Sequence, residues 1–416
     1  MEKDKLRQVM IDQQENFRKK EDLIDREIEL GYYLKGDEII VISGIRRCGK
    51  SSLLKLIAEQ VKCDKVFINF DDVRLSDFEI SNYQDIEDLS FELHGKDVTF
   101  FLDEIQTAPQ WQKWVNNLYS KNVKVFVTGS NSNLLSSELS TFLTGRHKQI
   151  ELQPFSFKEF LKLKRIKCDL GKLSSMQKVE LYKSFKEYFD TGGFPLVIRN
   201  DDVELSRQYF EDILNKDVIN RYKIREVKEL KDLALFLFSN VGQRYSYSTL
   251  KQVSGIKSLS TIKNYIDYFQ NVFVLYKVDR FDYSIKKQKV SSSKIYAGDN
   301  SFLRTIAFNF TKNLGRRLEN LVYLQLVRQK TDTYYHSAKT ECDFVIKKDL
   351  KITQAIQVAT NLSNPKTKKR EVDGLLDAMR KYELEEGLIL TLEEEDEINT
   401  ENYKIVIKPV WKWLLE

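Results

Sequence analysis

Residues 44–51 have the sequence Gly44-Ile45-Arg46-Arg47-Cys48-Gly49-Lys50-Ser51, which joins an apolar run over 39–42 to a stretch with helical periodicity over 52–58. Two glycines let the backbone wrap closely around an anion, so that consecutive N–H groups and the start of the helix point at a phosphate. A glycine turn without a ligand is the alternative. The order of strand, loop and helix favours a phosphate-binding loop.

The chemistry of such a loop assigns roles to its side chains. Lys50 is expected to reach the β- and γ-phosphates of a nucleotide, and the Ser51 hydroxyl is expected to hold Mg²⁺. ATP and Mg²⁺ are therefore the predicted cofactors, with ATP and ADP as the predicted ligands. The residues of this stretch predicted to bind the nucleotide are Gly44, Arg46, Arg47, Cys48, Gly49, Lys50, Ser51 and Ser52.

A second apolar run, over 98–102, ends in the two carboxylates of Asp103 and Glu104. We expect Asp103 to bind the Mg²⁺ through water, and Glu104 to orient and activate the attacking water as the catalytic base. An acidic strand end that faces solvent is the alternative. The run follows the phosphate loop at the separation that a parallel α/β core requires, which favours the metal site.

A third apolar run, over 124–128, leads into Gly129, Ser130 and Asn131. If this strand lies beside the previous one, Ser130 and Asn131 are candidate sensors of the γ-phosphate; the equal alternative is that they cap a helix beginning near Asn133. Further along the chain, Arg146 is a candidate arginine finger, acting in cis or from a neighbouring subunit. The alternative for Arg146 is a surface arginine paired with a carboxylate.

The chain as a whole is predicted to be α/β. Strands alternate with helices from about residue 38 to 152, which predicts a mainly parallel sheet covered on both faces. Residues 39–154 form the predicted nucleotide-binding core, and 155–238 are predicted to be helical. Residues 1–38 are predicted to be a polar helical lead-in, where acidic neighbours make Arg26 and the basic residues 18–20 a solvated face.

In their order along the chain, these segments resemble a prokaryotic AAA+-like ATPase family that carries a C-terminal domain of uncharacterised function and is related to archaeal ATPases of the STAND branch. The resemblance rests on the phosphate loop, Asp103-Glu104, residues 128–131, Gly145-Arg146 and residues 154–160, and it continues through 188–195 and 294–299. It implies a P-loop ATPase in which 155–238 form a helical lid and a linker to C-terminal modules.

Residues 239–299 have the pattern of a winged helix: helices over 248–253 and 258–269, and wing strands over 272–281 and 293–296. In DNA-binding versions the second helix enters the major groove and lysines bind phosphate. Packing alone is the alternative role of such a module. The basic residues on or near that helix and its wing are Lys257, Lys263, Lys277, Arg280, Lys286, Lys287 and Lys289.

Residues 300–416 resemble the PD-(D/E)XK nuclease fold, with Glu319 on a helix and Asp343 on a strand. An active member would have an acidic residue at 357 and a lysine at 359 to bind Mg²⁺ and stabilise hydroxide. This chain has Gln357 and Ala359 instead. A degenerate module for binding or assembly is therefore favoured over a nuclease.

Composition places the protein in the cytoplasm as a large soluble chain. Its 416 residues are 42% hydrophobic and 31% charged, with a net charge of +5 that neither requires nor excludes nucleic acid. The apolar runs are shorter than a membrane span, so no membrane partner and no secretory signal are expected. Four cysteines without paired metal spacing predict reduced thiols.

Three functions follow from these observations. The favoured one is an ATPase whose hydrolysis rearranges the C-terminal modules, with DNA as an open question. The second is a nucleotide-gated interaction switch with little hydrolysis, which acts through a homo-oligomer or a protein partner. The third is a metal-dependent DNA nuclease that uses Glu319 and Asp343.

Overall fold

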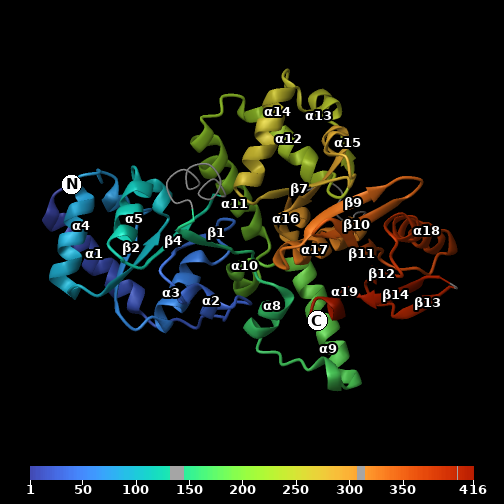
Figure 1. Cartoon of the computed structure of the whole chain (residues 1–416), viewed down its shortest axis with the longest axis horizontal. Coiled ribbons are helices and arrows are strands. Elements are labelled where there is room, and N and C mark those ends of the chain that lie inside the picture. Colours follow the sequence, from blue (N-terminus) through green and yellow to red (C-terminus); the bar gives the residue numbers. More distant parts are fainter. Residues whose placement is uncertain (132–144, 307–313, 401) are drawn as a thin grey trace. The chain divides into compact units, whose positions relative to one another are not determined.

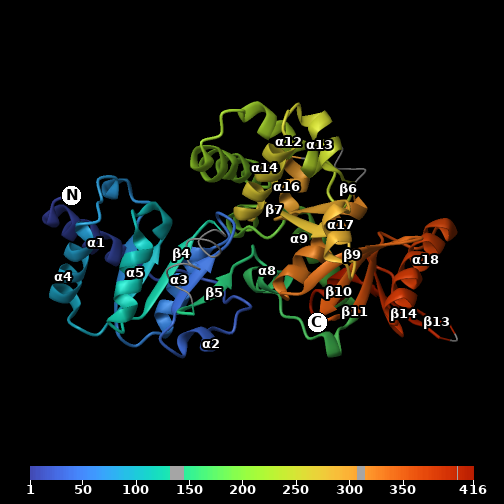
Figure 2. The same cartoon turned by 45° about the horizontal axis from the view of Figure 1, so that its top comes forward.

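The computed structural model describes residues 1–131, 145–306, 314–400 and 402–416. The helix expected near Asn133 therefore lies outside the described residues. The chain divides into two compact units, the first consisting of Met1–Pro154 with Asn271–Phe273 and the second of the remaining residues. Figures 1 and 2 show the two units from different directions, with the first in blue to cyan.

The first unit is built on a five-stranded sheet in the order β2-β3-β4-β1-β5, and all its strand pairs are parallel. This confirms the α/β class with a parallel sheet. The carboxyl ends of β1, β3 and β4 share one edge of the sheet, where the phosphate loop follows β1. The strands are β1 (Ile39–Ser43), β2 (Asp64–Asn69), β3 (Val98–Asp103), β4 (Val125–Gly129) and β5 (His147–Glu151).

Side chains alternate between the two faces of this sheet, as strand geometry requires. On one face, Val41, Leu102 and Val127 join an apolar core with Trp114 and Val115. On the other face, the rings of Phe101 and Phe126 stack with their centroids 5.0 Å apart. The helices are α2 (Leu30–Leu34), α3 (Lys50–Gln60), α4 (Asn82–His94) and α5 (Trp111–Ser120), and the short 3₁₀ turns are η1 (Val73–Leu75) and η2 (Ile105–Thr107).

Helix α1 (Lys3–Arg18) covers the edge of the sheet at β2. The Gln13 side chain accepts from the Asn69 N–H at 2.8 Å and donates to the Asn69 carbonyl at 3.1 Å, while Gln14 accepts from the Phe67 N–H at 3.0 Å. Phe17 stacks on Phe67 with ring centroids 4.2 Å apart. The first helix is thus part of the first unit, and it satisfies the outer backbone groups of the edge strand.

The second unit opens with helices, as expected for 155–238. Two of them begin with capping boxes, Ser156 with Glu159 and Ser174 with Gln177. The helices are α8 (Phe157–Leu163), α9 (Ser175–Thr191), α10 (Pro195–Asn200), α11 (Glu204–Asp212) and α12 (Val227–Ser239), with a 3₁₀ turn η3 (Leu170–Lys172) and a π-helix η4 (Ile213–Asn220).

Gly192 ends α9 in a backbone conformation with φ of +72°, and a Cβ atom there would lie 1.9 Å from the Asp299 Oδ1 atom. The next residue, Gly193, donates its N–H to Asp299 Oδ2 at 2.8 Å. The two glycines therefore allow a buried carboxylate to close on the end of the helix.

After α12 the chain forms a three-stranded antiparallel sheet in the order β6-β8-β7. The expected wing contains a helical turn, α15, between β7 and β8. The elements are β6 (Arg244–Tyr245), α13 (Tyr247–Ser254), α14 (Leu259–Asn271), β7 (Leu275–Asp279), α15 (Ile285–Val290), β8 (Ser293–Ala297) and α16 (Asn300–Thr305).

The chain ends in a six-stranded mixed sheet in the order β13-β14-β12-β11-β10-β9. Helix α18 (Pro365–Tyr382) packs on β10, β11 and β12, as Figure 1 shows in red. The other elements are α17 (Leu314–Arg328), β9 (Asp332–Ser337), β10 (Glu341–Lys348), β11 (Lys351–Val358), β12 (Glu386–Thr391), β13 (Asp396–Asn399), β14 (Lys404–Pro409) and α19 (Val410–Trp413). Among the described residues, no helix is both long and apolar enough to cross a bilayer.

Candidate nucleotide site

The loop between β1 and α3 has the backbone shape that its glycines allow. At Gly44, a Cβ atom would lie 2.1 Å from the carbonyl oxygen of Leu152, so only glycine fits there without a shift. Gly49 has a φ of +101° and starts α3. The first N–H groups of α3, an eleven-residue helix, thus face the inside of the loop.

Lys50 lies folded against this loop. Its side chain is buried, and its ammonium donates to the carbonyl oxygens of Gly44 at 3.2 Å and Ile45 at 3.3 Å. The same Nζ atom lies 3.8 Å from Glu104 Oε1. A positive charge therefore lies within the loop, next to the carboxylate predicted to act as base.

Ser51 and Asp103 come together at the carboxyl edge of the sheet. The Ser51 hydroxyl donates to Asp103 Oδ2 at 2.7 Å, and the Thr128 hydroxyl donates to Asp103 Oδ1 at 2.5 Å. Burial and the nearby charge of Glu104 raise the pKa of Asp103, against the opposing effect of these two hydrogen bonds and of Lys50. One carboxylate thus links three elements of the site.

Thr128 is a site residue that the sequence analysis did not select. It is fully buried, and its Oγ1 atom also accepts the Glu104 N–H at 3.0 Å. Its signals in the sequence are its place at the end of the third apolar run, where an apolar residue would fit the strand equally well, and its place in residues 128–131, a segment of the family resemblance.

Glu104 follows β3 in a left-handed backbone conformation with φ of +49°. Such a conformation is uncommon for a non-glycine residue and turns the chain sharply after the strand. The Gln106 amide donates to Glu104 Oε2 at 2.5 Å. The carboxylate is therefore held between Gln106 and Lys50.

Ser130 and Asn131 are buried directly after β4, which lies between β1 and β3 in the sheet. Their position is at the same edge as the phosphate loop. The helix that they would cap lies outside the described residues, so the sensor role stays a prediction.

Arg146 lies at the other edge of the sheet. It precedes β5, whose first residue pairs with Ile39 at the start of β1, whereas Ser43 at the end of β1 pairs with Glu151. Four residues of strand correspond to about 13 Å. The Arg146 guanidinium donates a hydrogen bond to Asn116 Oδ1 and lies 5.6 Å from the Tyr119 ring centroid. This position is remote from the loop of the same chain.

Arg26 contacts the phosphate loop, although its acidic neighbours favoured a solvated position. Its guanidinium donates to the Cys48 carbonyl at 3.2 Å and to the Gln153 carbonyl at 2.7 Å. It thus fastens the loop to the segment after β5. Cys48 itself is buried, and burial raises the pKa of its thiol.

The residues predicted for a nuclease site surround a lysine. Glu319 Oε1 and Asp343 Oδ1 lie 3.0 and 3.2 Å from Lys294 Nζ. Gln357 Oε1 accepts the Asp343 N–H at 3.2 Å, and Ala359 is buried in the apolar core. The structure thus brings Glu319, Asp343 and Gln357 together, around an ammonium that the sequence analysis did not foresee.

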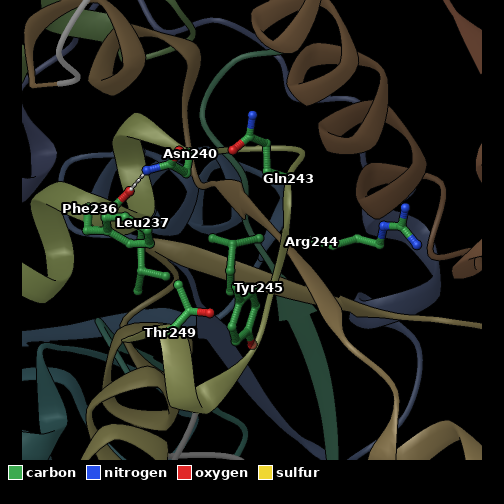
Figure 3. Close-up of a pocket in the computed structure, with 8 residues that line it drawn as sticks. Phe236, Leu237, Asn240, Gln243, Arg244, Tyr245 and Thr249 are labelled. Atoms are coloured by element: carbon green, nitrogen blue, oxygen red, sulfur yellow. Dashed lines mark hydrogen bonds between the residues drawn. The ribbon is translucent and has the colours of Figure 1, made fainter. Parts of the chain in front are cut away.

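A hollow of about 320 Å³, including its mouth, is lined by residues of α12, β6, α13 and β8 and of the turn before β6. Figure 3 shows that the Gln243 and Arg244 side chains point away from Tyr245 and Thr249. Asn240 is engaged through its amide, which donates to the Phe236 carbonyl at 2.8 Å. Leu237 and Ile295 complete a wall that is largely apolar.

The model of the AAA domain family matches residues 36–161, which include the phosphate loop and all the strands of the parallel sheet. A domain of unknown function, DUF8612, matches residues 182–313. The first unit is therefore an ATP-binding domain of the AAA class.

Two uncharacterised proteins are similar over nearly the whole chain. One, MJ1544 of Methanocaldococcus jannaschii, is 33% identical over 417 residues, covering 95% of this chain and 92% of the relative. The other, from Haemophilus influenzae, is 32% identical over 402 residues, covering 91% and 95%. Among solved structures, the Walker-type ATPase PABY2304 of Pyrococcus abyssi is 16% identical with a TM-score of 0.46, covering 69% of this chain and 97% of that one.

Proposed function

We propose that this chain, which belongs to the family of the archaeal protein MJ1544 and carries an AAA domain, is a Mg²⁺-dependent ATP hydrolase whose cycle rearranges its C-terminal modules. One observation carries the proposal: Ser51, Asp103 and Thr128, from three neighbouring elements, are joined by hydrogen bonds of 2.7 and 2.5 Å beside the buried Lys50. Lys50, Ser51 and Asp103 are the phosphate- and metal-binding groups that phosphoryl transfer uses, and Glu104, 3.8 Å from Lys50 Nζ, adds a base to position the water.

Each side chain has a role that follows from its position. The loop N–H groups and Lys50 bind and orient the phosphates, because both present positive charge to the inside of the loop. Ser51 Oγ and Asp103 Oδ2 are hard oxygen donors, and they would hold Mg²⁺ together with phosphate oxygens. When bound, the ion would neutralise charge on the β- and γ-phosphates.

Glu104 acts as the base that orients the attacking water and takes its proton. Gln106 and Lys50 position its carboxylate from opposite sides, with Lys50 Nζ at 3.8 Å. Arg146 lies at the amino end of β5, so its proposed role as a finger is confined to a neighbouring chain. That role requires a homo-oligomer in which one chain completes the site of the next.

The test is steady-state release of phosphate with Mg²⁺ and ATP. Lys50→Ala should reduce turnover to background, and Glu104→Gln should reduce kcat by about 10²- to 10³-fold while ATP still binds. Lys62→Ala, at an exposed position just after α3, is the matched control and should keep full activity. If the wild-type protein hydrolyses no more ATP than Lys50→Ala, the hydrolase proposal is wrong.

The remote position of Arg146 also supports the second candidate, a nucleotide-gated switch that controls assembly. In this case ATP and ADP would give different oligomers by size exclusion, with little turnover. Arg146→Ala should abolish the difference. Identical elution in both nucleotides, together with measurable turnover, would favour the hydrolase instead.

The order of elements after α11 supports DNA as a partner. Helix α12, strand β6, helices α13 and α14, and strands β7 and β8 follow the order of a winged helix, with antiparallel strands ordered β6-β8-β7. Lys277 is paired with Asp279 at 2.9 Å, which leaves it poorly suited to bind phosphate. The exposed lysines just before α14, on α14 and on the wing are Lys257, Lys263, Lys286, Lys287 and Lys289.

Duplex binding can be measured by fluorescence anisotropy at several salt concentrations. Removing the lysines of the wing, with Lys286→Ala, Lys287→Ala and Lys289→Ala combined, should weaken binding at low salt. It should also lower the slope of log K against log salt by about 2 to 3, because each phosphate contact contributes about 0.9. Equal slopes for this variant and the Lys62→Ala control would exclude the wing as the DNA-binding surface.

A further inference from the structure

Lys294 is an ammonium buried among three carboxylates in the second unit. It lies on β8, opposite Arg244 of β6, and its side chain is 1% exposed. Its Nζ atom lies 3.0 Å from Glu319 Oε1, 2.8 Å from Glu341 Oε1 and 3.2 Å from Asp343 Oδ1. Three different elements, α17, β10 and β8, therefore meet at one positive charge.

Each carboxylate is also held by a second group. The Tyr296 hydroxyl donates at 2.7 Å to Glu319 Oε1, the oxygen that contacts Lys294, and the Val358 N–H donates to Asp343 Oδ2 at 3.0 Å. The second oxygen of Glu341 lies 3.0 Å from Arg244 Nε. The oxygens around Lys294 are thus oriented by the fold, in the way that ligands of a metal ion are oriented by their neighbours.

Gly242 packs closely behind Glu319. Gly242 has a φ of +74°, and a Cβ atom there would lie 2.9 Å from Glu319 Oε2. On the other side, Gln357 bridges the Asp343 N–H and Glu371, to which its amide donates at 2.5 Å. The neutral amide of Gln357 therefore extends the network without adding negative charge.

The contacts match the bonding capacity of the ammonium. A lysine has three N–H donors, and three carboxylate oxygens lie within hydrogen-bond distance of this one. Divalent ions need closer oxygens, at about 2.0–2.1 Å for Mg²⁺ and 2.3–2.6 Å for Ca²⁺. In the described part of the chain, no three or more His, Cys, Asp or Glu side chains are arranged to hold a metal ion, and this includes Glu319, Glu341 and Asp343 as they stand around the ammonium.

The charges around Lys294 also favour an ammonium at this position. Burial lowers the pKa of Lys294, but the charges of Glu319, Asp343 and Glu341, with the Tyr296 phenol, outweigh it and raise the pKa well above its ordinary value. This shift of the pKa favours the protonated, positively charged form of Lys294.

We propose that Lys294 is a tethered cation that permanently fills the centre of the Glu319, Glu341 and Asp343 cluster and closes it to divalent metal ions. The ammonium then links β8, α17 and β10 without a metal ion. Because it occupies the position between the carboxylates, no metal ion can bind there to catalyse hydrolysis. A small side chain in place of Lys294 removes the ammonium and leaves its space empty, so that a divalent ion can enter the cluster. The proposal is independent of the ATPase, because it concerns residues of the second unit alone.

Thermal unfolding of the full chain with and without MnCl₂ tests this proposal, with no nucleotide present. All proteins carry Ser51→Ala and Asp103→Asn, which remove the two groups proposed to hold a metal ion at the phosphate loop. We expect no shift in Tm with Mn²⁺ when Lys294 is present. Lys294→Ala should unfold at lower temperature, and Mn²⁺ at a hundredfold excess over its Kd should restore about 5 °C or more.

Lys294→Met is the matched variant, because its side chain fills the space without a charge. It should be destabilised like Lys294→Ala, but Mn²⁺ should not restore it. Two results would overturn the proposal. One is a Tm shift with Mn²⁺ in the protein that keeps Lys294, if Asp343→Asn removes that shift. The other is a folded Lys294→Ala protein whose Tm does not change with Mn²⁺. If Lys294→Ala does not fold, the shift in Tm with Mn²⁺ is compared between the protein that keeps Lys294 and its Asp343→Asn variant. No shift in either protein supports the proposal, and a shift that Asp343→Asn removes overturns it.

Discussion

The Thr128 hydroxyl donates a hydrogen bond to Asp103 while its oxygen accepts the backbone N–H of Glu104. One buried threonine on β4 therefore holds both the Asp103 carboxylate, which we propose as a metal ligand, and the turn at Glu104, which we propose as the base. Because β4 lies next to β3 in the sheet, a side chain at its carboxyl end can fix the geometry of the residues that end and follow β3.

Thr128→Val keeps the shape of this side chain and removes its hydroxyl. Because the lost bond is made to a buried carboxylate, we expect kcat/KM for ATP to fall by about 10-fold or more, with a higher Mg²⁺ requirement. Thr128→Ser keeps the hydroxyl and should stay within a few-fold of the wild type. Unchanged Mg²⁺ dependence in the valine variant would show that Thr128 does not position Asp103.

Arg26→Ala should weaken ATP binding, because the loop carbonyl of Cys48 loses its connection to Gln153. We expect about a 10-fold higher Kd by calorimetry, with a smaller effect on kcat. Arg26→Lys cannot make both contacts in the same geometry and should behave similarly. Arg18→Ala, at an exposed position on α1, is the control and should bind ATP like the wild type.

Gly192→Ala should destabilise the second unit strongly, because its Cβ atom would collide with Asp299 and because the φ of +72° is unfavourable for alanine. The expected loss is about 3 kcal/mol or more of unfolding free energy, measured with urea. Gly95→Ala separates the two causes: its φ is +84°, but no atom lies within 4 Å of the added carbon. That variant should lose only about 1 kcal/mol.

Stability should fall as pH rises through neutrality because of Asp343. Burial and the charge of Glu319 raise the pKa of this carboxyl to about 7, with Lys294 and the Val358 N–H opposing and Glu371 adding to the shift. A group whose pKa is raised in the folded state stabilises fully below its unfolded pKa, near 3.8, and this contribution is lost as pH rises through 7. Asp343→Asn should flatten the dependence of Tm on pH over this window. An equal slope in both proteins would contradict the assignment.

The parallel sheet could be predicted because β1, β3 and β4 are nearly continuous apolar runs that lead into residues with evident chemistry. The phosphate loop, Asp103 and Glu104 were selected for that reason, and the structure places Ser51 within hydrogen-bond distance of Asp103. Arg26 and Lys294 could not be selected. Each is one basic residue among many, and what distinguishes it is the set of carbonyl or carboxylate oxygens that the fold brings to it from distant parts of the chain.

The two glutamines of α1 have a consequence for how the protein can associate. Since Gln13 and Gln14 already occupy N–H and carbonyl groups along β2, another polypeptide cannot extend the sheet laterally on that side. A chain cut after Arg18 would expose the strand and the ring of Phe67. It should form intermolecular β-pairs and precipitate on warming, whereas the intact first unit is protected from this route.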